Sequence, residues 1–180
     1  SKTQSPHLRF KINFKDNIEL HFTDIRKFGR IEFHNNLDFL NEKLGLEPFS
    51  NQLTADYLIQ KLCRRKGPIK SILLNQSIIV GIGNIYADEI LWEICVHPQK
   101  PANQLDIQKL TELISATQII LQKAINSMGT TIINFSFDKE SYGNYGSQLK
   151  VFNKNGENCI RCSDIIIKTK CAGRGTYYCP

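Results

Sequence analysis

The sequence has no run of about 20 consecutive apolar residues, the length that a membrane-spanning helix needs. Its first residues, from Ser1 to Pro6, lack the apolar stretch of a secretory signal peptide. The 180 residues also contain no internal repeat and no low-complexity tract. These absences exclude a membrane-spanning class, and we expect a soluble intracellular protein.

Acidic residues are few compared with basic ones, with 17 Asp and Glu against 23 Lys and Arg. The formal charge of +6 and a pI near 9.0 favour a polyanionic partner, because binding to a basic surface releases the polyanion's counterions. Charge alone does not decide between nucleic-acid binding and a basic surface without a ligand. With 41% hydrophobic residues, the chain can form one domain or two small ones.

The first third of the chain alternates between apolar and polar residues. This alternation predicts antiparallel strands over 8–14 and 18–22, joined by a turn at 15–17, and a further short strand around 31–33. Glycine and proline interrupt regular structure in the connector at 44–48, where we expect a domain boundary.

Helical spacing of apolar residues dominates the middle of the chain and predicts a helical bundle. The expected helices cover about 57–63, 69–75, 84–95 and 110–128. Beyond residue 130, Gly, Asn, Ser and Tyr predominate, which predicts a loop over 141–147 followed by a strand at 149–152.

Six cysteines are present, and four of them crowd the end of the chain, which indicates metal binding rather than a disulfide scaffold. These four are Cys159, Cys162, Cys171 and Cys179. Cys63 and Cys95 stand alone within apolar helical patterns, and we expect both to be small buried hydrophobes.

The CxxC pair Cys159 and Cys162 follows the turn-forming Asn155-Gly156, as in the thiolate knuckles of tetrahedral zinc sites. Cys179 follows at a spacing that fits a β-hairpin returning with a second knuckle, whose other ligand is expected beyond Pro180. Cys171 is expected where the hairpin crosses over and is not preferred. A redox CxxC is the alternative, but the surrounding sequence lacks the βαβ pattern of such proteins.

The segment 80–89 has the composition of an anion-binding helix start. Gly81 and Gly83 let backbone amides approach a phosphate, and Asn84 can cap the helix or donate to the ligand. Lys66 and Lys70 are expected on the preceding helix, flanking the same phosphates. The alternative is ordinary turn chemistry, since glycine before a helix is common.

The turn at 24–29 places Arg26 and Lys27 around Phe28. An apolar side chain beside a cation can be inserted into a base stack, although a strand phenylalanine is more often a core residue.

Together these elements resemble the formamidopyrimidine-DNA glycosylase and endonuclease VIII family, with the formamidopyrimidine branch the closer match. The resemblance rests on segments at 24–29, 44–48, 55–57, 66–70, 81–89, 97–98, 129–131 and 159–180. It implies an α+β fold: part of an N-terminal antiparallel β-sandwich (1–43), a helix-two-turn-helix domain (44–140), a lesion-capping loop and strand (141–152), and an incomplete zinc-ribbon hairpin (153–180).

The resemblance also implies a set of site residues. DNA contacts would be His7, Arg26, Phe28, Lys66, Lys70, Gly83 and Asn84, with Phe28 filling the stack beside the extruded nucleotide and Arg26 facing the orphaned base. Arg174 would hold the lesion phosphates and assist the elimination step. The loop over the oxidised purine would contain Tyr142, Gly143, Asn144, Tyr145 and Gly146, and Zn²⁺ would be held by Cys159, Cys162 and Cys179. His7 is equally compatible with a plain surface position, whereas for Arg174 the surrounding Gly173-Arg174-Gly175-Thr176 favours the contact role over a solvated turn arginine.

The activity so implied is base-excision repair: a DNA glycosylase and abasic-site lyase for oxidised purines, monomeric, cytoplasmic and nucleoid-associated, acting on damaged double-stranded DNA and not on membranes. The family's proline nucleophile, the glutamate after it and a lysine on an early loop are not residues of this chain, so we expect it to bind damaged DNA rather than cut it. The alternatives are a non-catalytic helix-two-turn-helix module for DNA or RNA, and an endonuclease VIII-type enzyme for oxidised pyrimidines.

Overall fold

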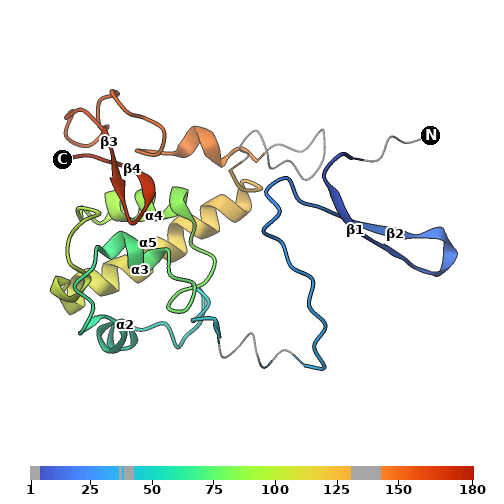
Figure 1. Ribbon diagram of the computed structural model, residues 1–180. Coiled ribbons are helices and arrows are strands. Elements are labelled where there is room, and N and C mark those ends of the chain that lie inside the picture. The colour runs from blue at the N-terminus through green and yellow to red at the C-terminus, as the bar shows by residue number, and fades with distance from the viewer. Residues whose placement is uncertain (1–4, 37, 39–42, 131–142) are drawn as a thin grey trace. The chain divides into compact units, whose positions relative to one another are not determined.

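The computed structural model describes residues 5–36, 38, 43–130 and 143–180, and the chain divides into two compact units, Ser1–Leu37 and Asp38–Pro180 (Figure 1). Among the described residues, no helix is long and apolar enough to cross a membrane.

The smaller unit is built on a β-hairpin of β1 (Leu8–Asn13) and β2 (Glu19–Thr23). The strands are antiparallel, with Ile12 opposite Leu20, as the alternating sequence predicts. The expected turn is a short 3-10 segment, η1 (Lys15–Asn17). The strand expected around residues 31–33 is wrong, because this segment pairs with no neighbouring strand in the described part of the chain.

The larger unit contains the four expected helices: α2 (Ala55–Leu62), α3 (Ile69–Leu73), α4 (Asn84–Glu93) and α5 (Ile107–Asn126). Two begin at side-chain caps, which bond to the unpaired amides of a helix start. Thr54 accepts from the amide of Tyr57, and Asp106 accepts from that of Lys109.

The core of this unit lies where α5 packs against α2 and α4. Helices α2 and α5 contribute the apolar stripes that their periodicity predicts, including Leu58 and Leu62 of α2 and Leu110, Leu113 and Leu121 of α5. Helix α4 contributes the consecutive Ile90 and Leu91. A 3-10 turn, η2 (Ala102–Gln104), links α4 to α5.

The C-terminal residues form a ribbon whose antiparallel strands are β3 (Ile167–Cys171) and β4 (Arg174–Tyr178). Ala172 and Gly173 connect them with φ angles of 51° and 72°, the left-handed values that tight hairpin turns require. The ribbon lies along α4 (Figure 1), and a second small core forms around Val151, Cys159, Ile166 and Tyr177.

The strand expected at 149–152 is also wrong. Its amides bond to a side chain instead: Lys150 donates to one carboxylate oxygen of Glu89, and Val151 and Phe152 donate to the other, over 2.7 to 2.9 Å. Glu89 is only 3% exposed. The carboxylate therefore satisfies three amides that a neighbouring strand would otherwise pair.

The expected burial of the two lone cysteines is wrong, since Cys63 and Cys95 are both exposed. Cys63 directly follows the last residue of α2 as its C-cap, and Cys95 lies two residues beyond the end of α4 with a φ of 53°. The helical periodicity that suggested burial stops at each helix end, where the chain turns outward.

We predict that Glu89→Gln destabilises the larger unit by about 2 kcal/mol or more, because hydrogen bonds to a charged group contribute ~1.5–3 kcal/mol each and an amide offers one acceptor instead of two. Denaturant unfolding of both proteins measures the difference. The control is Glu157→Gln, which removes an exposed ion pair with Lys154 and should change stability little. Equal effects of the two substitutions would contradict the anchoring role of Glu89.

Candidate functional site

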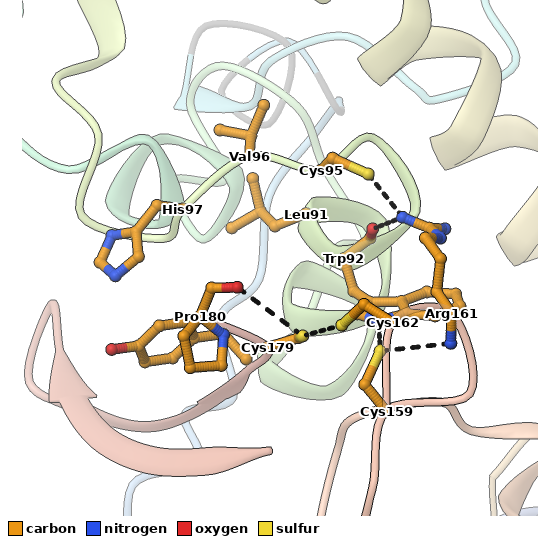
Figure 2. A pocket seen from close by; sticks show the side chains of 11 residues that line it. Leu91, Trp92, Cys95, Val96, His97, Cys159, Arg161, Cys162, Cys179 and Pro180 are labelled. Atoms are coloured by element: carbon orange, nitrogen blue, oxygen red, sulfur yellow. Dashed lines mark hydrogen bonds between the residues drawn. The ribbon is translucent and has the colours of Figure 1, made fainter. Parts of the chain in front are cut away.

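Three cysteine thiols converge on one point of the ribbon. The sulfur atoms of Cys159, Cys162 and Cys179 lie within 4.8 Å of one another, and those of Cys162 and Cys179 are 3.2 Å apart (Figure 2). The chain folds around Cys159 as a knuckle: its amide donates to Asp164 O at 2.7 Å, and its carbonyl accepts from Ser163 N at 2.8 Å. Three soft donors in this arrangement can bind a metal ion.

The fourth cysteine of the C-terminal group is not part of this cluster. Cys171 ends β3, is buried, and directs its thiol to the carbonyl of Pro98, 3.7 Å away. The sequence-based preference for the other three cysteines over Cys171 agrees with this geometry.

The three thiols differ in their tendency to ionise. Burial opposes ionisation of Cys159, but hydrogen bonds from the Trp92 indole and from the amides of Arg161 and Cys162 outweigh it and lower its pKa to about 6. Burial, together with the two neighbouring cysteines, raises the pKa of Cys179 to about 12. A cluster of adjacent thiolates needs a cation to compensate their charge, which a divalent metal ion would supply.

The N-terminus of α4 is open, as expected for an anion-binding helix start. Gly83 is the N-cap, and both Gly83 and Gly81 are exposed with no atoms within 4 Å of where a side chain would begin. Asn84 does not cap the helix: its amide nitrogen donates to Gly175 O of β4 at 3.0 Å. The helix start and the ribbon are therefore joined directly.

The structure contradicts the prediction that Lys70 is a phosphate contact. Its side chain is fully buried, with Nζ 2.6 Å from Asp88 Oδ1 in an ion pair and bonded to Thr176 Oγ1 at 2.7 Å and to Gly175 O at 3.2 Å. Burial raises the pKa of Asp88 to about 6, although its bonds with Lys70 and with the amide of Tyr177 act in the opposite direction. With its charge used internally, Lys70 is a structural residue.

Two further cations of the larger unit are exposed. Lys66 lies in the connector between α2 and α3 and not on a helix, which corrects the sequence-based placement. Arg174 is the first residue of β4, immediately after the tight turn, and its side chain is exposed at the tip of the ribbon. Both are accessible to a ligand in solution.

In the smaller unit, the carboxylate of Asp24 organises the predicted turn. It accepts from Arg26 N at 2.8 Å and from Gly29 N at 2.7 Å, and these bonds, that from Gly29 foremost, lower the pKa of Asp24. Phe28 is 75% exposed, which excludes the reading of it as a core residue, and the Arg26 guanidinium lies 5.1 Å from its ring centre. His7 is half-buried beside this turn, where its carbonyl accepts from Asp24 N.

The expected lesion loop is described only in part, because Tyr142 lies outside the described residues. Asn144 and Tyr145 donate their amides to Ser127 O and Gly129 O, and the backbone of Gly129 leaves no room for a side chain on Gly143. Tyr145 is buried, at the start of η3 (Tyr145–Gln148), which contains Gly146. Tyr145 therefore anchors the end of the predicted lesion loop.

Sequence reasoning missed the buried acids Asp88 and Glu89 and the contacts of Trp92 and Arg161. The signal was present for the acids, because two adjacent carboxylates interrupt the apolar pattern of α4 on the side that must be buried. No sequence pattern indicated the contacts of Arg161, because they join segments that are far apart in the sequence.

Comparison with known proteins agrees with this geometry. Residues 44–136, more than half of the chain, match the family model described as Formamidopyrimidine-DNA glycosylase H2TH domain. The formamidopyrimidine-DNA glycosylase of Bacillus cereus is 37% identical over 178 residues, 97% of this chain and 64% of the relative. That of Rickettsia conorii is 42% identical over 182 residues, 99% of this chain and 66% of the relative.

Solved structures give the same result. Lactococcus lactis Fpg in complex with DNA containing an abasic site matches with a TM-score of 0.85 at 37% identity, over 98% of this chain and 66% of that one. MutM (Fpg) from Thermus thermophilus matches with a TM-score of 0.86 at 28% identity, over 98% of this chain and 68% of that one.

A helical domain that matches over residues 44–136, with a cysteine-bearing ribbon along α4, defines a helix-two-turn-helix protein of mixed α and β structure. The chain belongs to the formamidopyrimidine-DNA glycosylase family. It spans 64% of the length of the Bacillus cereus relative.

We predict that Lys70→Met lowers the stability of the larger unit by about 3–5 kcal/mol, because it leaves the buried Asp88 carboxylate unpaired. The double variant Lys70→Met/Asp88→Asn should recover part of this loss, since the amide is uncharged and can still accept from the Tyr177 amide. Chemical denaturation of the three proteins gives the comparison. A double variant less stable than Lys70→Met alone would argue against an orphaned charge as the cause.

Proposed function

We propose that the protein is a base-excision repair DNA glycosylase with abasic-site lyase activity, acting on oxidised purines in double-stranded DNA. The observation that carries this proposal is the bond between Asn84 and Gly175 O, which joins the open start of α4 to the ribbon bearing Arg174. The bond holds two anion-binding groups together: the backbone amides at the helix start, where the helix dipole is favourable, and the guanidinium of Arg174. Together they form a surface that suits a sugar-phosphate strand. Solved structures of Lactococcus lactis Fpg include complexes with Fapy-dG, abasic-site and oxidised-pyrimidine DNA.

In this function the larger unit would bind phosphates through Gly83, Asn84, Lys66 and Arg174, with Arg174 also assisting elimination. The smaller unit would act on the base stack. Exposed Phe28 would fill the space left by an extruded nucleotide, and Arg26 would face the orphaned base, since flipping requires a substitute for the lost stacking.

The remaining assigned positions follow from the same proposal. His7 would contact the backbone beside the turn, and Gly143, Asn144 and Gly146 would form the anchored side of the lesion loop. In this proposal these residues bind and orient the DNA. The proposed setting is a monomer acting at the bacterial nucleoid in the cytoplasm.

The metal proposed for the cysteine cluster is Zn²⁺, held by Cys159, Cys162 and Cys179. The donor set fits, because three thiols lie close enough to share one ion and one of them has a lowered pKa. When bound, the ion would neutralise the thiolates and hold the two arms of the ribbon together. Its role is structural, since these cysteines support the strand that begins at Arg174.

An alternative is a non-catalytic DNA-binding module of the same fold. The two differ in their preference for damage: a glycosylase should bind duplex with an abasic-site analogue more tightly than intact duplex. Equal affinity for the two duplexes would favour the non-catalytic module.

We predict that Phe28→Ala lowers affinity for abasic-site duplex at least about tenfold more than affinity for intact duplex, because only the damaged site extrudes a nucleotide at low cost, and tenfold corresponds to ~1.4 kcal/mol. Arg174→Ala should weaken both complexes alike and reduce the slope of affinity against salt by about one unit. Fluorescence anisotropy at several salt concentrations measures both effects. If Phe28→Ala weakened both complexes to the same extent, as expected for Arg174→Ala, the proposed insertion of Phe28 into the base stack would be wrong.

We predict one zinc ion per chain in the purified protein, measured by atomic absorption. Cys179→Ser should lose most of it, because serine is a poor ligand for zinc, whereas Cys171→Ser should retain it. Loss of zinc in Cys171→Ser but not in Cys179→Ser would reverse the ligand assignment.

A further inference from the structure

Arg161 lies between the two cysteines of the CxxC pair, but its side chain points away from the thiols and reaches the end of α4 (Figure 2). Its guanidinium donates to the carbonyl oxygens of Trp92 at 2.8 Å and Glu93 at 3.3 Å. It also stacks on the Trp92 indole, 4.0 Å from the ring centre, and approaches the thiol of Cys95. One side chain of the ribbon therefore makes several contacts with a single helix end.

This helix end needs a cation. The last carbonyls of a helix have no partner within it and carry a partial negative charge, which basic residues in the last turn commonly compensate. The last turn of α4 contains no basic residue. Two cations from outside α4 supply this charge: Lys109 of α5 donates to the carbonyl of Ile94 at 3.0 Å, and Arg161, 68 residues beyond Glu93, donates to the carbonyls of Trp92 and Glu93.

Trp92 links this contact to the cysteine cluster. Its indole Nε1–H donates to the sulfur of Cys159 at 3.3 Å, while the face of the same ring holds the Arg161 guanidinium. The amide of Arg161 is also directed to the Cys159 sulfur, 3.5 Å away. A candidate ligand sulfur and the end of α4 thus share Trp92 and Arg161.

The ribbon also holds the opposite end of α4. The amide of Tyr177 donates to Asp88 at 3.0 Å, and Asn84 at the helix start donates to Gly175 O. The helix whose N-terminus would bind phosphate is therefore fastened to the ribbon at both ends, and the fastening at its C-terminal end depends on Arg161.

We propose that Arg161 is a positioning residue that couples metal binding at the cysteine cluster to the docking of α4. The inference rests on the metal binding proposed above. Metal would fix the knuckle so that Arg161 and Trp92 keep their contacts, and the docked helix would in turn orient Cys159 as a ligand. Because such coupling is reciprocal, weakening the contact of Arg161 with α4 must weaken metal binding, although Arg161 does not touch the metal.

The test uses Arg161→Lys, which retains the charge but loses the planar group that bonds two carbonyls and stacks on the indole. Zinc affinity is measured by competition with a chromogenic chelator. We expect about tenfold weaker zinc binding, the lower part of the range for residues that support metal ligands. The matched control is Arg65→Lys, in which an arginine that donates to Lys61 O at the end of α2 is changed in the same way. This control should leave zinc affinity unchanged.

A second readout reports on the helix end directly. Trp92 is the single tryptophan of the chain, so its emission reports the contact. In wild type, stripping zinc with the chelator should shift the emission to longer wavelength, as the indole loses its partners. In Arg161→Lys, the zinc-bound protein should already resemble the stripped wild type.

If Arg161→Lys bound zinc as tightly as wild type and showed the same emission shift on stripping, the inference would be overturned. If wild type itself failed to bind zinc, both the proposed metal site and the inference would be overturned. If Arg161→Lys does not fold, as judged by thermal unfolding in excess zinc, Trp92→Phe carries the test. Phenylalanine keeps an aromatic face but removes the N–H that bonds Cys159. We expect weaker zinc binding there as well, and unchanged binding would again overturn the inference.

Discussion

The arrangement of the larger unit depends on the buried ion pair between Lys70 and Asp88. Bringing two charges into a protein interior costs several kcal/mol per ion, and their attraction offsets this cost only where further hydrogen bonds satisfy both groups. Here Thr176 and the carbonyl of Gly175 accept from Lys70, and the amide of Tyr177 donates to Asp88. The network joins three elements: Lys70 lies in α3, Asp88 lies in α4, and the hydrogen-bond partners lie in β4. The ion pair is satisfied only when the three elements meet in one register, so its main effect is on specificity of packing.

Sequence-based predictions succeeded where they did not depend on contacts of this kind between distant segments. The four helices, the first hairpin and the choice of three cysteines follow from patterns local to each segment, namely apolar periodicity, turn residues and ligand spacing. Two of the wrong predictions have a different cause, namely a contact with a carboxylate from a distant segment. Lys70 was assigned to phosphate because it lies in a basic segment, whereas its burial is set by a carboxylate on another helix. The strand expected at 149–152 gives way to the Glu89 carboxylate for the same reason.

Two exposed residues show that the burial of a single side chain is difficult to predict from the sequence. A phenylalanine in a strand-rich segment is usually buried, and only the structure shows that the bonds of Asp24 fold the turn so that Phe28 stays 75% exposed. Cys95 is exposed because the helix ends before it. In both cases, the position of a turn or a helix end decides burial, and residue type does not.

Two carboxylates buried within α4 raise an electrostatic question for a helix whose N-terminus would bind phosphate. Uncompensated, Asp88 and Glu89 would repel an anion through a medium that screens charge poorly. Each is compensated differently: Asp88 by the ammonium group of Lys70, and Glu89 by three backbone amides whose dipoles point at it. The buried lysine would thus favour the proposed anion binding without touching the anion, because it cancels a negative charge about one turn from the open amides of Gly83 and Asn84. A buried basic residue can support a nucleic-acid-binding surface by neutralising a buried carboxylate. Sequence alone does not distinguish that role from direct contact with the nucleic acid.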